Sequence, residues 1–444
     1  MRITFTALVL ALASAAPAQE QRPAPPGPFI SADYATSYVR LGQREGEALL
    51  FTPAAKQSIS RIALVYAHPN GNTFGEPLGP QMAARGHLTL MVNHRGDGDS
   101  DDGYAPAISQ AIRYMRSLPG VEKVVLVGHS GGGHLVALYQ NVAENGPAAC
   151  SGPEKLYPCR RELVSGLEKP DGLVMLDPTL GAFHQASSAD PLGGLARRDP
   201  ALDMFAAANG YDLSARSANY SPAFTIRFHH AQARRNAAIV AAAQARLALL
   251  NAGKGQFRDD EPFVVKGMGV AASGARLYQP DTTLLSHTHA SYRLYKADGS
   301  DSVEQIRSVR PVTGQQVLEA LGTLEQMTQS TSVRRFLGNS AIRMSANFAI
   351  DADSISGVDW HSAMSSTPAN AEGIKVPTMV LTMSCHYLVV PGEIIFQHLA
   401  ARDKSYGAIE GATHLFAPCK PQYGNTVKRT FDAVGEWLHK EGRF

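Results

Sequence analysis

Short apolar runs that alternate with helix-like segments shape both ends of the chain. The runs are rich in Val, Ile and Leu, which is typical of strands buried on both faces of a parallel sheet. They occupy residues 61–67, 87–93, 124–127, 171–176, 376–383 and 405–409. Helices are predicted between and after them, for example at residues 107–118 and 425–440. The alternation predicts an α/β fold whose sheet is mostly parallel and doubly wound.

This alternation stops between residues 181 and 371. The segment contains a long Ala-rich stretch, which predicts one long helix, and pieces with the pattern of short strands. The predicted elements are a helix at 227–250, a possible hairpin of 275–278 with 291–295, and a helix at 314–327. We therefore expect an insertion between a first core part, 60–180, and a second, 372–444.

The start of the chain has the pattern of a secretory signal peptide. Met1 and Arg2 give a charged start, an apolar stretch covers residues 5–12, and small residues lead to Ala18, where cleavage is expected. The stretch is too short to cross a bilayer, and no other segment approaches the ~18–20 apolar residues needed. The sequence predicts a secreted or periplasmic protein, with a Pro-rich leader and N-terminal strands at 19–59.

Composition changes this picture little. The chain has 444 residues, of which 44% are hydrophobic and 18% charged, with a formal net charge of +2. Such a length suits a large α/β domain with an insertion. The near balance of charges lacks the basic excess that is typical of nucleic-acid binding, so no nucleic-acid partner is expected.

Four cysteines in an exported chain permit two disulfides, for which three pairings exist. Cys150 and Cys159 flank a short Pro- and Gly-containing loop, which a local bond would close. Cys385 follows a core strand and Cys419 follows His414, so this pair would join two loops near one edge of the sheet. The pairings Cys150–Cys159 and Cys385–Cys419 are favoured. A metal site is the alternative, but no CxxC spacing supports it, and no metal is predicted.

The segment after the apolar run at 124–127 carries the strongest functional signal. Gly128-His129-Ser130-Gly131-Gly132 separates this predicted strand from a predicted helix. It resembles the G-x-S-x-G nucleophile elbow of the α/β-hydrolase superfamily, in which a sharp turn exposes the serine hydroxyl at the edge of the sheet. The resemblance implies that Ser130 is the nucleophile. The alternative is an ordinary turn from a strand to a helix.

The resemblance also implies a catalytic base. A serine hydroxyl is a poor nucleophile at neutral pH and needs a base that a third group orients. Gly-Ala-Thr-His at 411–414, after the final predicted strand, is similar to the loop that delivers the catalytic histidine in this superfamily. His414 is therefore the expected base, and the order of serine before histidine fits.

The acid departs from the superfamily pattern. A Gly-x-x-Asp turn is expected after the strand at 376–383, but the chain has His386 near the place of the aspartate. Some members take the acid from the end of the strand that follows the elbow helix, where this chain has Asp177. Glu393, at the start of the next predicted helix, is the alternative acid, and a carboxylate from the insertion is a third option. Asp177 also has a structural interpretation, since Asp-Pro is a common turn.

An oxyanion hole needs two N–H donors. The resemblance assigns one to Gly131, just after the serine. The other is expected from the loop at 68–72, which is similar to the His-Gly-x oxyanion loop with Pro69 in place of Gly. Because proline lacks an N–H, Asn70 is the expected donor.

The turn at 94–100 is also similar to a superfamily feature and is expected to be structural. Four aspartates, Asp97, Asp99, Asp101 and Asp102, offer a calcium loop as the alternative, although the glycine and terminal glutamate of an EF-hand are missing.

Taken together, these residues predict a secreted serine hydrolase that cleaves a small-molecule or polymeric carboxylic ester without a cofactor. In this superfamily an insertion after Asp177 is the place of a lid over the substrate pocket. A serine nucleophile argues against dehalogenase and epoxide hydrolase chemistry, which uses aspartate there. An amidase or peptidase of the same fold is the alternative enzyme. A catalytically silent hydrolase fold used for binding is the alternative of another class.

Overall fold

The computed structural model describes most of the chain after its N-terminal region. The described residues are 33–42, 46–54, 59–69, 72–94, 100–193, 199–269, 274–312 and 327–444. The predicted signal peptide, Asn70 and all but the last residue of the predicted helix at 314–327 lie outside them. None of the described helices is both long and apolar enough to cross a bilayer.

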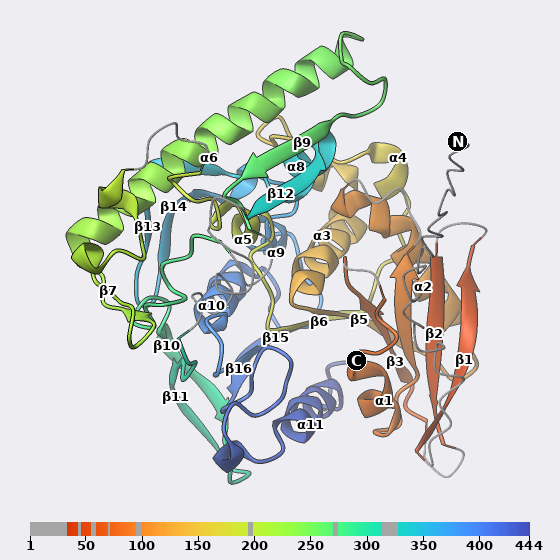
Figure 1. Cartoon of the computed structure of the whole chain (residues 1–444). Helices are drawn as coiled ribbons and strands as arrows, with labels where there is room; N and C mark the ends of the chain where they lie inside the picture. Colours follow the sequence, from red (N-terminus) through yellow and green to blue (C-terminus); the bar gives the residue numbers. More distant parts are fainter. Residues whose placement is uncertain are drawn as a thin grey trace, which may run out of the picture.

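Ten strands of the described chain form one central sheet (Figure 1). In spatial order they are β1 (Tyr34–Leu41), β2 (Gly46–Pro53), β4 (Thr89–His94), β3 (Ile62–Ala67), β5 (Lys123–His129), β6 (Gly172–Leu176), β15 (Thr378–Met383), β16 (Lys404–Ile409), β10 (His287–Tyr295) and β11 (Asp301–Arg307). The strands from β4 to β10 run parallel, and the pairs at both ends are antiparallel. The predicted mostly parallel sheet is thus confirmed.

Helices cover both faces of this sheet, because its strands are apolar on both sides. On β5, Val124 and Leu126 pack toward α2 (Ala105–Ser117), α3 (Gly131–Asn145) and α10 (Val389–His398). Val125 and Val127 point the other way, toward α1 (Leu78–Ala83) and α11 (Thr426–Leu438). All four valine and leucine side chains are fully buried, and each such burial stabilises the fold by about 1.5–3 kcal/mol. This packing explains why the runs are apolar at every position instead of at alternate ones.

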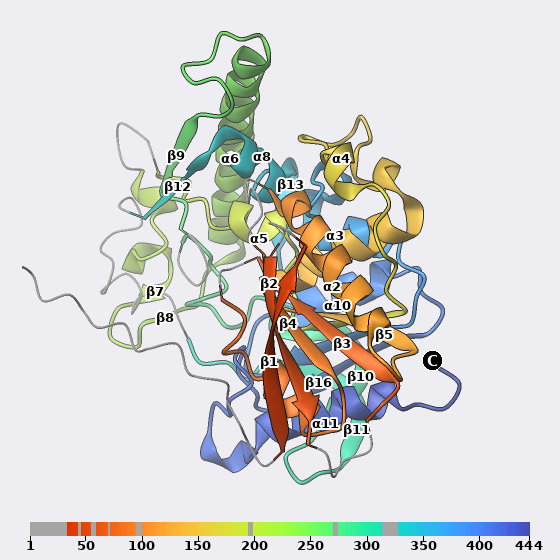
Figure 2. The same cartoon turned by 90° about the vertical axis from the view of Figure 1, so that its right-hand side faces the viewer.

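The segment between residues 181 and 371 adds β10 and β11 to the sheet, and its other elements form smaller units. Its larger elements are α6 (Pro222–Asn251), β9 (Pro262–Lys266), β12 (Thr328–Ser332), α8 (Val333–Asn339), β13 (Arg343–Ile350), β14 (Ile355–Asp359) and α9 (Thr367–Ala371). β9 pairs with β12, and β13 pairs with β14. In Figures 1 and 2, α6, β9 and β12 lie at one end of the molecule and α11 lies at the opposite end. The predicted long helix is present as α6.

The predicted hairpin of 275–278 with 291–295 is wrong. Residues 275–278 are buried but form no strand, whereas 291–295 belong to β10. β10 pairs with β11 on one side and with β16 on the other. The exposed edge of β16 offered a parallel partner with unpaired backbone groups, and a local pattern of apolar residues carries no information about such a distant edge.

Short elements complete the chain between these larger ones. They are η1 (Asp101–Tyr104), η2 (Pro147–Cys150), α4 (Arg161–Val164), α5 (Ala182–Ala186), η3 (Pro200–Leu202), η4 (Ala207–Asn209), β7 (Tyr211–Asp212), β8 (Ser217–Ala218), η5 (Trp360–Ser362) and η6 (Pro421–Tyr423).

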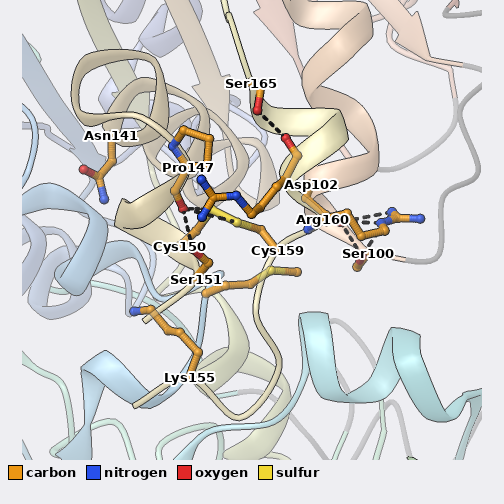
Figure 3. The surroundings of a disulfide bond; sticks show 12 residues. Ser100, Asp102, Asn141, Pro147, Cys150, Ser151, Lys155, Cys159, Arg160 and Ser165 are labelled. Atoms are coloured by element: carbon orange, nitrogen blue, oxygen red, sulfur yellow. Dashed lines mark hydrogen bonds and ion pairs between the residues drawn. A yellow bond between two sulfur atoms is a disulfide. The ribbon is translucent and has the colours of Figure 1, made fainter. Parts of the chain in front are cut away.

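Both disulfides join the cysteines that the sequence favoured. Cys150–Cys159 closes the loop after α3 (Figure 3). Next to it, the guanidinium of Arg160 donates hydrogen bonds to both carboxylate oxygens of Asp102, at 3.0 and 3.2 Å. Asp102 is buried, so this bidentate pair anchors the closed loop to the start of α2.

Candidate active site

Ser130 lies on a strained turn between β5 and α3. Its backbone has φ 55° and ψ −120°, a conformation that L residues rarely adopt. The turn is held by backbone hydrogen bonds: the Ser130 N–H donates to the Leu176 carbonyl at 2.9 Å, and the Ser130 carbonyl accepts from Gly133 and Thr179 at 3.0 and 3.1 Å. The neighbouring strand β6 thus fixes the serine at the carboxyl end of β5.

The glycines around Ser130 are required by close packing. A Cβ on Gly128 would lie 2.3 Å from the carbonyl oxygen of Gly132, and one on Gly132 would lie 2.5 Å from the carbonyl oxygen of Ala67. A Cβ on Gly133 would lie 2.4 Å from the Cβ of Pro178. These separations are too short for any side chain, so the small residues let β5, α3 and the adjacent loops meet.

Three side chains from distant parts of the chain form a line of hydrogen bonds. His414 Nε2 is 2.8 Å from Ser130 Oγ, and His414 Nδ1 is 2.6 Å from Asp177 Oδ2. Since a carboxylate only accepts, Nδ1 carries the proton and Nε2 is left to accept the serine hydroxyl proton. Each residue follows a parallel strand: Ser130 follows β5, Asp177 follows β6, and His414 lies in the loop after β16.

Asp177 is fully buried and remains an anion. Burial alone would raise the pKa of its carboxyl group, but the charges and hydrogen bonds of His386 and His414 outweigh burial and hold the pKa below its ordinary value. Its Oδ1 also accepts the Met383 N–H at 3.1 Å. Its backbone has φ 42°, so the acid, like the serine, occupies a strained position.

Glu393, the alternative acid, has a different role in the structure. It is buried in α10, and none of its described hydrogen bonds reaches His414. Instead, its Oε2 and Oε1 accept the backbone N–H groups of His289 and Ala290 at 2.7 and 2.9 Å. These bonds attach β10 to α10. Sequence position alone placed Glu393 near the turn after β15, but the helix directs it toward the added strand.

Two more histidines, His386 and His129, lie beside these three side chains, and the sequence had predicted a role for neither. His386 Nδ1 is 2.7 Å from Asp177 Oδ2, the same oxygen that His414 contacts. His129 is buried beside His414, and its Nε2 donates to the His414 carbonyl at 2.8 Å. Burial lowers the pKa of His129 to about 3, aided by the charge of His414, so His129 is a neutral donor. The signal for His386 was its place in the turn where an aspartate was expected.

Asp177, His386 and His414 are also of the types that bind metals. One ligand atom from each lies within 4.8 Å of the others, a grouping found by searching the described residues. The two imidazole–carboxylate distances of 2.6 and 2.7 Å are those of charge-assisted hydrogen bonds, in which each Nδ1 carries a proton. A metal ion requires unprotonated nitrogens, so we assign these atoms to hydrogen bonds.

The structure describes Gly131, one of the two expected oxyanion donors, but not Asn70, the other. Gly131 is the first residue of α3, and the N–H groups of a first helical turn have no acceptor within the helix. Pro69 lies close by, since a Cβ on Gly131 would be 3.3 Å from Pro69 Cγ. The loop that precedes Asn70 thus faces Gly131, while Asn70 itself lies outside the described residues.

A cavity of about 390 Å³ opens at Ser130. One part of its described lining comes from the segments after β3 and β6 and from η1, α3 and α5, and includes His68, Pro69, Asp101, Tyr104, Gly131, His134, Thr179, Gly181, His184 and Gln185. β12, α8 and the residue after α8 supply a second wall, made of Gln329, Thr331, Arg335, Asn339 and Ser340. No Leu, Ile, Val, Met or Phe appears among these described lining residues, and most of their side chains carry a polar group.

The described aspartates of the alternative calcium loop have separate partners. Asp101 Oδ2 lies 3.1 Å from His134 Nε2, and Asp102 binds Arg160. These two carboxylates therefore serve different contacts. Asp97 and Asp99 lie outside the described residues.

The strand order, the strained elbow on β5 and the histidine loop after β16 define an α/β-hydrolase fold. No family model matches the chain, and no curated protein matches it in sequence.

Among solved structures, the chain is similar to an esterase from the bacterial hormone-sensitive lipase family (10% identity, TM-score 0.40, covering 93% of this chain and 86% of that one). It is also similar to Est1E from Butyrivibrio proteoclasticus (11%, 0.37, 91% and 97%). A third similar structure is brefeldin A esterase, a bacterial homologue of human hormone-sensitive lipase (13%, 0.40, 92% and 77%). Similarity at these TM-scores carries no argument about function, so the fold assignment rests on the topology.

Proposed function

We propose that this chain is a serine hydrolase that cleaves carboxylic esters through an acyl-enzyme intermediate. The observation that carries the proposal is the line of hydrogen bonds from Ser130 through His414 to Asp177, with distances of 2.8 and 2.6 Å. The strained elbow that holds Ser130 at the cavity supports it.

In this mechanism, Ser130 Oγ attacks the ester carbonyl while His414 Nε2 takes the hydroxyl proton. The tetrahedral oxyanion forms near the Gly131 N–H, with Asn70 as the proposed second donor. His414 then gives its proton to the departing alkoxide, which leaves as an alcohol. A water molecule repeats the sequence on the acyl group and releases the acid. Asp177 keeps the required tautomer of His414 and stabilises its protonated form.

The residues that line the cavity support the proposal that the substrate is an ester whose acid or alcohol part is small and polar. A long alkyl chain gains its binding energy from apolar surface that it removes from water, and no Leu, Ile, Val, Met or Phe side chain lines the described wall. Gln329, Asn339 and Arg335 instead offer hydrogen-bonding groups on the side opposite the elbow. Arg335 is exposed, and its guanidinium forms no ion pair with any residue that the structure describes.

A fluorophosphonate probe tests the proposed chemistry, because it reacts with an activated serine. The wild-type protein is expected to be labelled and to hydrolyse p-nitrophenyl acetate faster than p-nitrophenyl decanoate. Ser130→Ala is expected to lose both labelling and turnover while keeping its circular dichroism spectrum. A folded wild-type protein that resists the probe would contradict the proposal, and faster cleavage of matched anilides would favour an amidase.

We also propose that the protein works outside the cytoplasm. The charged and apolar pattern of residues 1–18 supports export, and two disulfides agree with an oxidising compartment. Fractionation of cells that express the full chain, with mass spectrometry of the mature N-terminus, tests this proposal. Retention of Met1 in a cytoplasmic product would contradict it.

A further inference from the structure

The carboxylate of Asp177 serves two imidazoles at once. Oδ2 lies 2.6 Å from His414 Nδ1 and 2.7 Å from His386 Nδ1, and the two rings lie side by side with centroids 4.5 Å apart. Only His414 reaches Ser130 among these described histidine contacts, through its Nε2. His386 therefore touches the acid without touching the nucleophile.

We propose that His386 is a positioning residue, whose Nδ1–H holds the Asp177 carboxylate and takes part of its charge away from His414, so that it sets the pH range of the reaction. This inference rests on the proposed function. It goes further, because the line from Ser130 to Asp177 is complete without His386.

The charge state of His386 suits this role. Burial lowers the pKa of its imidazole, and the charge of His414 lowers it further, while Asp177 acts in the opposite direction. A neutral ring that faces a carboxylate through Nδ1 must carry its proton on that nitrogen. His386 is thus a fixed hydrogen-bond donor at neutral pH.

Other titratable and charged groups that the structure describes also lie near His386. Arg310, after β11, also lowers the pKa of His386, and its guanidinium is itself fixed on the backbone carbonyls of Tyr278, Leu284 and Leu285. Tyr387 packs on the ring at a centroid distance of 4.3 Å, and burial raises the Tyr387 pKa. Burial also keeps nearby His184 neutral by lowering its pKa. Asp177 is therefore the anion that His386 faces.

The backbone holds the turn with His386 firmly against the loop with His414. The Cys385 N–H donates to the Ala412 carbonyl at 2.9 Å, and the disulfide from Cys385 to Cys419 joins the same two segments. The His386 carbonyl accepts a hydrogen bond from the Ser308 hydroxyl at 2.8 Å. A side chain on such a fixed turn can hold its partner in one orientation.

The position of His386 also explains why it is not an acid. A carboxylate there would lie beside the buried anion of Asp177, and two such groups do not both ionise at close range. A neutral donor satisfies the second lone pair of Oδ2 instead. In this chain the turn after β15 thus supports an acid that comes from the end of β6.

The test compares His386→Leu, which removes the donor, with His386→Asn, whose amide N–H replaces it. In His386→Leu the Asp177 carboxylate interacts with His414 alone and stabilises its protonated form more strongly. The acidic limb of the kcat/KM profile is therefore expected to shift to higher pH by about 0.5–1 pH unit. kcat is expected to fall about tenfold because the acid is less well oriented. His386→Asn is expected to restore most of both values.

His87→Leu is the matched control, since His87 is a buried histidine that binds the Ile62 carbonyl near the opposite ends of the strands. It is expected to lower stability without moving the pH profile. An unchanged acidic limb in His386→Leu, with activity retained, overturns the role of His386 and leaves the proposed function intact. Absence of fluorophosphonate labelling in the wild-type protein would instead overturn the proposed function.

Proton NMR provides a readout that does not depend on the leucine variant folding. The wild-type protein is expected to show two far-downfield imidazole N–H signals, of which His386→Asn removes one and Asp177→Asn removes both. Two signals that both persist in His386→Asn would overturn the proposal.

Discussion

In the central sheet, each residue of the proposed triad follows a buried parallel strand, whereas the opposite wall of the cavity comes from β12 and α8 of the inserted segment. In the first group, the backbone N–H groups of Ser130 and Asp177 donate to carbonyls of the neighbouring strands β6 and β15. The second lies on a two-stranded sheet and a short helix. The strands of the sheet thus place the proposed triad, and the inserted segment supplies a second part of the cavity wall.

The test with the largest expected effect compares substitutions at Asp177 and Glu393, the two carboxylates that the sequence offered as the acid. Asp177→Asn is expected to lower kcat by about 10⁴-fold, because His414 then takes the wrong tautomer. Glu393→Gln is expected to keep most of the activity and to lower stability, since it weakens the bonds to His289 and Ala290. Turnover of p-nitrophenyl acetate and urea unfolding measure both effects. A large loss of kcat in a folded Glu393→Gln protein would contradict this assignment.

The second test concerns the packing of the elbow. Gly132→Ala is expected to destabilise the protein by about 3 kcal/mol or more, because its Cβ would press on the Ala67 carbonyl oxygen at 2.5 Å. Gly75→Ala is the control, since no atom lies within 4 Å of its added Cβ, and its effect should stay within about 0.5 kcal/mol. Urea unfolding measures both, and equal stabilities would show that the elbow can relax.

The third test uses a buried histidine of the insertion. Burial lowers the pKa of His229, on α6, to about 4. In the unfolded chain its pKa is about 6.5, so the unfolded state binds more protons between these values and stability falls as pH falls. From pH 7 to pH 5, this residue is expected to contribute a loss of about 2 kcal/mol. His229→Leu should reduce the pH dependence of unfolding by that amount, and an identical slope would contradict the buried neutral state.

The smallest expected effect is on substrate choice. Arg335→Gln is expected to lower kcat/KM for an ester with a free carboxylate by about twofold to fivefold, because a single exposed ion pair is worth up to about 1 kcal/mol. A neutral acetate ester should be cleaved as before. Arg334→Gln is the control, since Arg334 binds the Asp259 carbonyl instead of lining the cavity. Equal losses for both esters would show that Arg335 supports the structure of α8 and does not select substrates.

The sequence predicted the sheet well because burial on both faces leaves a continuous apolar signal along each strand. It also brought Ser130 and His414 to attention, since the elbow and the histidine loop are local patterns. The sequence left Asp177 as one of several candidate acids, because an Asp-Pro pair after a strand has the same sequence pattern in a structural turn and in a site where the aspartate orients a histidine. The contact that distinguishes them joins residues 177 and 414, which only the folded chain brings together.

The inserted segment shows where such reasoning ends. The sequence pattern of α6 predicted a helix. It could not predict that β10 pairs with β16, because β16 lies more than a hundred residues further along the chain. His386 was visible only as a departure from an expected aspartate. Its contact with Asp177 depends on the position of two strand ends in space.

The attachment of β10 and β11 to β16 has a consequence for the protein in concentrated solution. Without them, β16 would present a row of unpaired backbone groups to which strands of other chains could add. With them, the outer strand is β11, which carries Asp301, Glu304 and Arg307. Charges on an edge strand discourage pairing between molecules. The insertion therefore protects this edge of the sheet against aggregation while the opposite part of the same segment shapes the cavity.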